Sequence, residues 1–185
     1  YNDFNTFYLQ ASSSTSGGSS GSPVMDIHGD VVALNAGASS ETASSFFLPL
    51  DRVQHALELL RAGQPVARGT LGAIFGYTAF DQLRRLGLRE TSETAVRRQF
   101  PDGIGMLVVN EVLPGGPAAG ALQVGDILVQ INGEYVSEFV PLAAALDEVV
   151  GQPLDLLVER GGQVIRLRLG VQDLHRFTPD EYLQF

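Results

Sequence analysis

One serine- and glycine-rich segment of the chain has residue types that suit nucleophilic catalysis. Residues 17–24 read Gly-Gly-Ser-Ser-Gly-Ser-Pro-Val. A serine hydroxyl attacks a carbonyl carbon when a base activates it and when backbone N–H groups stabilise the resulting oxyanion. Glycines beside the serine permit the tight backbone path that such a turn requires. The segment is therefore a candidate site for acyl transfer.

Two other interpretations of this segment start from its composition and spacing. Ser12 to Ser22 contains only Ser, Thr and Gly, which is typical of a flexible linker. Residues 17–21 also match G-x-S-x-G, the nucleophile elbow of α/β-hydrolases. That elbow needs a helix directly after its serine, whereas Pro23 and two β-like runs follow here. The hydrolase interpretation is therefore disfavoured.

The elements predicted around the segment are short strands and one helix. Two β-like runs flank His28-Gly29-Asp30, which is a hairpin signal. Asp51 is the expected N-cap of the helix, and residues 37–45 are the expected polar loop. The predicted elements are a strand at Phe7–Ala11, the β-like runs Val24–Ile27 and Val31–Leu34, the apolar run Phe46–Leu50, and a helix with Val53, Leu57 and Leu60 on one face.

After Gly63-Gln64-Pro65 the chain alternates predicted strands and helices. Asn132-Gly133 favours a two-residue hairpin turn, and Arg160–Gln163 separates two β-like runs. Gly87 is expected to end a short helix. The predicted strands are 71–75, 106–109, 126–131, 154–159 and 164–169, and the predicted helices are 80–86 and 139–150.

The composition excludes several classes of chemistry. The 185 residues contain no Cys, and all 12 Lys or Arg positions are Arg, so thiol catalysis, Cys-ligated zinc and lysine Schiff bases are excluded. A formal net charge of -9 opposes binding to phosphate backbones, so no nucleic-acid partner is expected. No run approaches the length of a membrane span, so none is expected in this chain.

Residues 18–24 resemble the nucleophile loop of trypsin-like proteases of the HtrA/Deg family, whose usual form is G-N-S-G-G-P-L. On this alignment Ser20 is the nucleophile, and the backbone N–H groups of Gly18, Ser19 and Ser20 are implied to form the oxyanion hole. Two positions depart from the family form, because Ser19 replaces Asn and Ser22 replaces the second Gly.

The resemblance extends to Phe46–Arg52 and is greatest to the nuclear HtrA-like proteases of fungi. In trypsin-like chains the base His and its orienting Asp precede the serine. None of the 19 residues before Ser20 is a histidine, and none of His28, His55 and His175 occupies the base position of the family. We therefore interpret this part as the C-terminal part of a protease domain and predict that the chain alone does not hydrolyse peptides.

The chain from Ala67 onward resembles a PDZ domain of the HtrA type. Three blocks agree with that family in order, and the segment 89–103 between an expected helix and strand looks like an insertion. The blocks are Leu113-Pro-Gly-Gly-Pro-Ala-Ala119, Leu122-Gln-Val-Gly-Asp-Ile-Leu128 and Ile131-Asn-Gly133.

The PDZ resemblance implies that a peptide adds as a strand beside an edge strand near Ala73–Phe75. Its terminal carboxylate would meet backbone N–H groups, a nest that needs no basic side chain. Arg68 could draw the carboxylate in or be a solvated surface residue. Two leucines of the 139–150 helix are candidates for the pocket wall or for plain core packing. The candidate peptide-binding residues are Leu71, Gly72, Ala73, Ile74, Leu142 and Leu146.

The expected fold class is mainly β with α, with part of a trypsin-like second β-barrel over 1–63, an HtrA-type PDZ domain over 66–171 and a linker over 172–185. The resemblance implies part of an ATP-independent serine endopeptidase of protein quality control, with no metal and no cofactor. The alternative is a non-catalytic peptide-binding scaffold with a degenerate protease-like domain. An intact His and Asp upstream would favour the enzyme.

The resemblance also implies partners and compartments. The expected substrates are unfolded or damaged proteins, and the expected ligands of the PDZ domain are C-terminal peptides. The full-length protein is expected to assemble from identical subunits. The expected compartment is a bacterial cell envelope (periplasm) or a eukaryotic nucleus.

Overall fold

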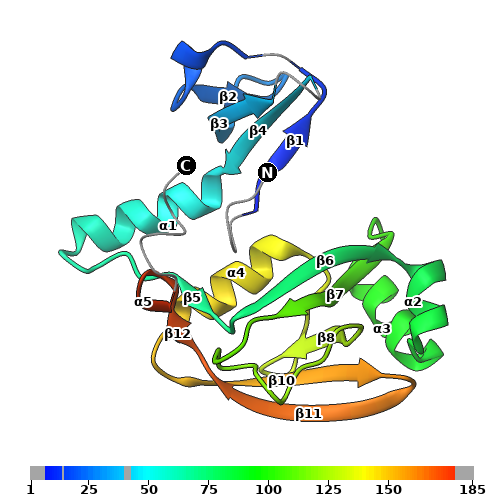
Figure 1. Ribbon diagram of the computed structural model, residues 1–185. Coiled ribbons are helices and arrows are strands. Elements are labelled where there is room, and N and C mark those ends of the chain that lie inside the picture. The colour runs from blue at the N-terminus through cyan, green and yellow to red at the C-terminus, as the bar shows by residue number, and fades with distance from the viewer. Residues whose placement is uncertain (1–6, 14, 40–42, 178–185) are drawn as a thin grey trace. The chain divides into compact units, whose positions relative to one another are not determined.

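The computed structural model describes residues 7–13, 15–39 and 43–177. The chain divides into two compact units, residues 1–66 and residues 67–185. In both units antiparallel strands predominate and a few helices accompany them (Figure 1). The predicted class, mainly β with α, is therefore confirmed, whereas the predicted domain boundaries stay predictions.

The first unit is a four-stranded antiparallel sheet followed by a helix. Its strand order is β1-β4-β3-β2. The elements are β1 Leu9–Ala11, the 3₁₀ turn η1 Gly17–Ser19, β2 Pro23–Met25, β3 Val31–Ser39, β4 Ser44–Pro49 and α1 Leu50–Arg61. In the turn between β2 and β3 the Asp26 carboxylate accepts the N–H groups of His28 and Asp30, at 2.8 and 3.0 Å. The predicted hairpin is confirmed, and an Asx-type turn closes it.

The predicted polar loop over residues 37–45 is wrong for its described part. β3 continues to Ser39 and β4 begins at Ser44, and these two residues pair with each other. Residues 40–42 lie outside the described residues. Glycine, alanine and serine have little strand preference of their own, but antiparallel pairing satisfies their backbone N–H and C=O groups. Pairing across the sheet therefore overrides the local signal.

The N-cap of helix α1 lies two residues earlier than predicted. Pro49 occupies the N-cap position, and Asp51 lies in the first turn. A carboxylate there still stabilises the helix, because it lies near the positive end of the helix dipole. The expectation that Asp51 is the N-cap is therefore corrected, while the helix itself is confirmed.

The second unit is built on a five-stranded antiparallel path ordered β11-β10-β8-β7-β6, with β9 paired to β8. Figure 1 shows α2 and α3 together at one end of this sheet and α4 near β5. The elements are β5 Gly69–Thr70, β6 Ala73–Ala79, α2 Phe80–Leu86, α3 Glu90–Gln99, β7 Gly105–Val112, β8 Ile127–Ile131, β9 Glu134–Tyr135, α4 Phe139–Glu148, β10 Pro153–Arg160, β11 Gln163–Gly170, β12 Gln172–Asp173 and α5 Leu174–Phe177.

Two clusters of buried apolar side chains hold the second unit together. The larger cluster joins α4 to the sheet and includes Leu71, Phe75, Leu107, Leu128, Leu142, Leu146, Leu154 and Leu156. The smaller cluster joins α2 and α3 to the sheet and includes Phe80, Leu83, Val96, Met106, Ile127 and Val129. Segment 89–103, interpreted as an insertion, thus contains a helix that contributes Val96 to a core.

Short-range turn signals are confirmed in this unit. The dipeptide Asn132-Gly133 joins β8 to β9, and both residues have positive φ, 49° and 87°, as a two-residue hairpin turn requires. Gly87 ends α2 in a left-handed conformation. β10 and β11 pair along their whole length across the turn at residues 161–162. Local residue types were sufficient to place these three turns.

Residues 172–177, which we predicted to begin a linker, fold onto the second unit. Gln172 of β12 pairs with Thr70 of β5, and Asp173 pairs with Gly69. The Leu174 N–H donates to the Arg68 carbonyl at 2.6 Å. The first and last strands of this unit therefore lie side by side. The rest of the predicted linker, residues 178–185, lies outside the described residues.

Candidate functional sites

The serine-rich segment forms the turn between β1 and β2. Gly18 and Ser19 are in η1, and Ser20 directly follows it with φ -59° and ψ 133°. Gly21 has φ +81°, a conformation that residues with a Cβ rarely adopt, so the turn needs a glycine there. Ser20 is exposed. The three residues predicted for the oxyanion hole are therefore consecutive in one turn, with the predicted nucleophile at its exposed end.

Strand β3 holds this turn through main-chain hydrogen bonds. The Gly21 N–H donates to the Asn35 carbonyl at 2.7 Å, and the Asn35 N–H donates to the Ser22 carbonyl at 2.9 Å. Both bonds involve one residue of β3 and lie just after Ser20 in sequence. The turn is therefore attached to the sheet, and the interpretation as a free flexible linker does not describe residues 19–22.

The side chain of Asn35 adds a second set of contacts. Its Nδ2 donates to the Ser19 carbonyl at 3.0 Å and to Ser19 Oγ at 2.9 Å. Ser19 Oγ donates in turn to the Ser16 carbonyl at 2.6 Å, and Ser22 Oγ donates to the Ser19 carbonyl at 2.6 Å. Sequence analysis missed Asn35. The strand alternation that buries Ala33 also turns Asn35 inward, and that period could have revealed it.

The Asn35 amide is only partly satisfied. Asn35 is 4% exposed, and its Oδ1 accepts no hydrogen bond from the described residues. A buried polar atom without a partner costs about 1–3 kcal/mol of folding free energy. The first unit therefore carries an unfavourable buried oxygen immediately beside the candidate nucleophile loop.

The N–H of Ser19 points back along the turn in this conformation. The Ser19 N–H donates to the Ser16 carbonyl at 3.0 Å, as expected where each N–H of a 3₁₀ turn meets the carbonyl three residues earlier. Within the described part of the chain, no side chain is hydrogen-bonded to the Ser20 hydroxyl. His28 lies in the β2–β3 turn, His55 in α1 and His175 in α5. The described residues therefore supply no base to Ser20.

The predicted carboxylate loop of the second unit lies between β5 and β6. Two of its carbonyls accept hydrogen bonds from the segment after β7. The Ala118 N–H donates to the Leu71 carbonyl at 2.9 Å, and the Leu113 N–H donates to the Gly72 carbonyl at 2.8 Å. The Gly72 N–H donates to Thr70 Oγ1 at 3.0 Å. β6 follows this loop and is an edge strand of the sheet, which is the position that strand addition requires.

The two candidate leucines of α4 are buried. Leu142 is 1% exposed and Leu146 is 5% exposed, and both belong to the larger core cluster together with Leu71 and Ala73. Four of the six candidate peptide-binding residues are therefore brought together in one cluster. Gly72 and Ile74 adjoin them on the loop and on β6. The side chains of Leu142 and Leu146 contribute to the core whatever else they do.

Helix α4 is fastened to β5 by a carboxylate that sequence analysis missed. Asp147 Oδ1 accepts the Gly69 N–H at 2.7 Å, and Asp147 Oδ2 lies 3.6 Å from Arg68 Nε. A Cβ on Gly69 would overlap the Leu146 carbonyl oxygen, so only glycine permits this close approach. Arg68, considered as an attractor of the peptide carboxylate, is therefore ion-paired within the unit.

Three carboxylates are buried in the described part of the second unit. Asp126 accepts a bidentate pair of bonds from Arg160, at 2.6 and 2.7 Å. Glu159 accepts the N–H of Arg89 at 2.7 Å and the hydroxyl of Ser92 at 2.5 Å, so it caps α3. The hydrogen bond from Arg84 holds the pKa of Glu93 below its ordinary value, against the opposing effect of burial. These groups support the fold.

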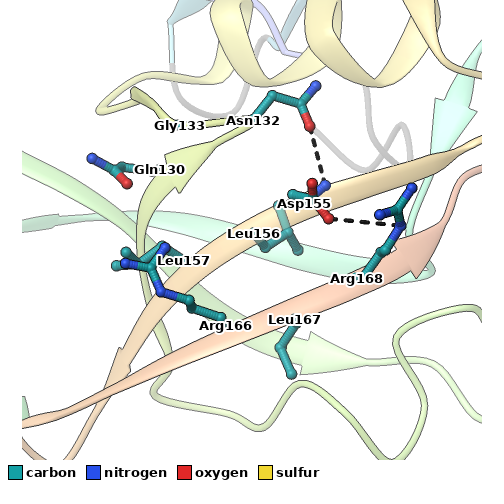
Figure 2. Close-up of a pocket in the computed structure, with 9 residues that line it drawn as sticks. All are labelled: Gln130, Asn132, Gly133, Asp155, Leu156, Leu157, Arg166, Leu167 and Arg168. Atoms are coloured by element: carbon teal, nitrogen blue, oxygen red, sulfur yellow. Dashed lines mark hydrogen bonds and ion pairs between the residues drawn. The ribbon is translucent and has the colours of Figure 1, made fainter.

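An open depression with both polar and apolar lining residues lies on the sheet of the second unit (Figure 2). Asn132 Oδ1 accepts the Asp155 N–H at 3.1 Å, and Arg168 Nε lies 3.8 Å from Asp155 Oδ1. Its other lining residues are Gln130, Gly133, Leu156, Leu157, Arg166 and Leu167. Both members of the Arg168–Asp155 pair are mostly exposed, at 71% and 63%, so solvent weakens their attraction.

The described residues contain no group of three or more His, Cys, Asp or Glu side chains that could hold a metal ion. Over the same described residues, no helix has the length and apolar character needed to cross a membrane.

Comparison with known sequences assigns part of the chain to a domain family. A family model described as PDZ domain matches residues 108–160. The chain is 52% identical over 195 residues to Protease Do-like 7 of Arabidopsis thaliana, in a match that covers 100% of this chain and 18% of that protein. It is 50% identical over 184 residues to Pro-apoptotic serine protease NMA111 of Yarrowia lipolytica, covering 100% of this chain and 19% of that protein. The chain thus spans under a fifth of these relatives.

Solved structures of HtrA-type proteases are also similar to this chain. The HtrA-type protease AlgW with tripeptide is similar at a TM-score of 0.53 and 25% identity, covering 81% of this chain and 48% of that chain. The same protease with decapeptide is similar at a TM-score of 0.53 and 24% identity, covering 82% and 44%. Together with the sequence matches, these findings confirm the predicted PDZ domain and the predicted resemblance to HtrA-like proteases.

Proposed function

We propose that this chain, which carries a PDZ domain and is related over its whole length to HtrA-like serine proteases, supplies the nucleophile loop and a peptide-binding domain to a serine endopeptidase. The observation that carries the proposal is the position of Ser20, which is exposed at the end of a turn that β3 fastens on its C-terminal side. The serine proteases among the relatives support the same chemistry.

In the proposed reaction Ser20 Oγ attacks the peptide carbonyl, the C–N bond breaks and the amine leaves, and water then hydrolyses the acyl-enzyme. A base outside the described residues takes the hydroxyl proton and gives it to the leaving amine. The backbone N–H groups of Gly18, Ser19 and Ser20 are the candidate donors to the oxyanion. Since the Ser19 N–H donates to the Ser16 carbonyl in this conformation, the peptide group between Gly18 and Ser19 must rotate before the Ser19 N–H can bind the oxyanion.

The second unit is proposed to bind peptide ends at β6. A peptide would pair with this edge strand, and its carboxylate would meet the N–H groups of Leu71, Gly72 and Ala73. The Gly72 N–H donates to Thr70 Oγ1 in this structure, so that bond must break before the Gly72 N–H can bind the carboxylate. The related HtrA-type protease structures with a tripeptide and a decapeptide support peptide binding by this kind of protein.

A second candidate function is a peptide-binding scaffold with a degenerate protease-like part. The observation that favours it is the bond from the Ser19 N–H to the Ser16 carbonyl at 3.0 Å, which occupies one of the candidate donors to the oxyanion. The two functions differ in one measurable property, which is covalent reaction at Ser20.

The wider role follows from the enzyme proposal. Unfolded or damaged proteins are the proposed substrates, C-terminal peptides are the proposed ligands of the second unit, and the full-length protein is proposed to assemble from identical subunits. A bacterial cell envelope and a eukaryotic nucleus are the two proposed compartments. The plant and fungal sources of the relatives favour the nucleus, which microscopy of the tagged full-length protein tests.

Labelling by a fluorophosphonate probe tests the proposed chemistry in the full-length natural protein. The probe should label the wild type and should not label Ser20→Ala, because the attacking oxygen is missing. Ser12→Ala is the matched control, since Ser12 is an exposed serine upstream of the same turn, and it should label normally. Retained labelling in Ser20→Ala, or no labelling of the folded wild type, would favour the scaffold.

A further inference from the structure

We propose that Asn35 is a positioning residue for the proposed acylation, because its side chain sets the orientation of the peptide groups next to Ser20. This inference rests on the proposed function and adds a residue that the resemblance does not assign. Asn35 lies on β3, 15 positions after Ser20 in sequence. It is a positioning residue and not a catalytic one, because it contacts Ser19 and not the reacting hydroxyl.

The contacts of Asn35 converge on the residue before the nucleophile. Its Nδ2 reaches both the carbonyl and the hydroxyl of Ser19, at 3.0 and 2.9 Å. The Ser19 carbonyl also accepts the Ser22 N–H at 3.1 Å and the Ser22 hydroxyl at 2.6 Å. The peptide group between Ser19 and Ser20 is therefore oriented by three donors on its carbonyl side. Its N–H is that of Ser20, one of the proposed donors to the oxyanion.

The Ser19 hydroxyl links Asn35 to the beginning of the turn by two hydrogen bonds. It accepts from Asn35 Nδ2 and donates to the Ser16 carbonyl at 2.6 Å. One amide group thus fixes peptide groups on both sides of residues 17–19. A shift of the Asn35 side chain would rotate the N–H groups that the oxyanion needs, while the main-chain bonds of Gly21 and Ser22 would keep the loop attached to β3.

The unsatisfied oxygen of Asn35 indicates that packing alone does not explain this residue. Asn35 is only 4% exposed, and its Oδ1 accepts no hydrogen bond from the described residues. An apolar side chain of similar size would avoid that unfavourable atom. An asparagine is therefore favoured here by the hydrogen bonds that its Nδ2 donates, and these bonds go to Ser19 of the nucleophile loop.

The first experiment compares Asn35→Ala with wild type in the full-length natural protein. We expect the rate of fluorophosphonate labelling and kcat for a peptide substrate to fall about 100-fold, as misplacement of reacting groups by a remote substitution can do. KM and the Kd of a free C-terminal peptide for the second unit should stay unchanged. Circular dichroism confirms that the variant remains folded.

The second experiment uses pH to separate positioning from packing. In Asn35→Asp an ionised carboxylate faces the Ser19 carbonyl and repels it, whereas a protonated carboxyl can donate a hydrogen bond to it. The labelling rate of this variant relative to wild type, measured at each pH, should therefore rise as the pH falls. Asn35→Leu is the size-matched control, and its rate relative to wild type should be low and independent of pH.

The outcomes separate this inference from the proposed function. Labelling that disappears in Ser20→Ala but is unchanged in a folded Asn35→Ala would overturn the role of Asn35 alone. If Asn35→Ala does not fold, the same conclusion follows from a pH-independent ratio for Asn35→Asp, and a ratio that rises at low pH supports the proposal. Labelling that persists in Ser20→Ala would overturn the proposed function and this inference together.

Discussion

The interiors of the two units differ in the kind of side chain that they bury. In the described part of the first unit, Ala33 and Phe46 are the buried hydrophobic side chains, and α1 buries no residue. The other buried residues of its described part are Pro49, Asn35, Ser44 and Ser45. The second unit has two apolar clusters, one on α4 and one on α2 and α3. Among the described residues, the first unit therefore has a small and largely polar interior, and the second unit has a larger apolar one.

This difference matches the tasks proposed for the two units. A hydrogen bond adds only about 0.5–1.5 kcal/mol of net stability, but it defines the direction of the groups that it joins. Apolar burial has no direction and contributes in proportion to area. The loop around Ser20 needs defined peptide orientations, whereas an edge strand such as β6 needs a stable sheet behind it. Each unit has the kind of interaction that its task requires.

The largest expected contrast is between matched leucine truncations in the two units. Leu154 of β10 is 0% exposed, and Leu60 of α1 is 63% exposed. Leu154→Ala should lower the free energy of unfolding of the second unit by about 3 kcal/mol, because it leaves a cavity. Leu60→Ala should change stability by less than about 0.5 kcal/mol. Urea unfolding of the chain by circular dichroism measures both, and equal costs would contradict the comparison.

A smaller contrast is expected between two arginines of the second unit. Asp126 is fully buried beneath Arg160, so Arg160→Ala leaves an uncompensated carboxylate and should cost about 2 kcal/mol of unfolding free energy. Arg168→Ala removes an exposed partner of Asp155 and should cost under about 0.5 kcal/mol. Thermal unfolding distinguishes them. If Arg168→Ala lowered the unfolding free energy as much as Arg160→Ala, exposure would not decide how much these ion pairs stabilise the unit.

The smallest expected effect is a pH dependence from Glu93. Its pKa in the folded state is lowered, first by the hydrogen bond from Arg84, so between the folded and unfolded pKa values the unfolded chain binds more protons. The stabilisation is therefore complete above the ordinary pKa of a glutamate and is lost as the pH falls through the lowered value.

Urea midpoints between pH 7 and pH 3 test this effect of Glu93. The advantage of wild type over Glu93→Gln should shrink as the medium becomes acidic. Glu90→Gln, at an exposed position on the same helix, controls for removing one negative charge. An advantage of wild type over Glu93→Gln that is the same at every pH would contradict the prediction.

Local signals in the sequence were sufficient for turns and most strands. Asn132-Gly133 and Gly87 have residue types that allow positive φ, and the structure uses them there. The loop predicted over 37–45 failed because its small residues gain their strand conformation from pairing with β4. The position of a partner strand cannot be deduced from the residues of one strand alone.

The candidate sites also have features that local sequence signals predict and features that depend on distant residues. The exposed turn at Ser20 was predictable, because glycines and a following proline mark it in the sequence. The contacts of Asn35 with Ser19 and of Asp147 with Gly69 span 16 and 78 positions, and no local period connects their members. Glu159 caps α3 from 70 positions away. Such polar contacts depend on tertiary packing, which a single sequence does not display.

The pairing of β5 with β12 has a mechanical consequence. Gly69, where the chain enters the second unit, is paired with Asp173, where it leaves, and the two strands are antiparallel. Tension applied from both neighbouring segments would separate these strands one bond at a time, beginning with the bond from the Leu174 N–H to the Arg68 carbonyl and continuing at Gly69. The Gly69 pair also carries the contact between the Gly69 N–H and Asp147. A stretching force would therefore loosen the junction of β5 with α4 while the apolar clusters stayed intact.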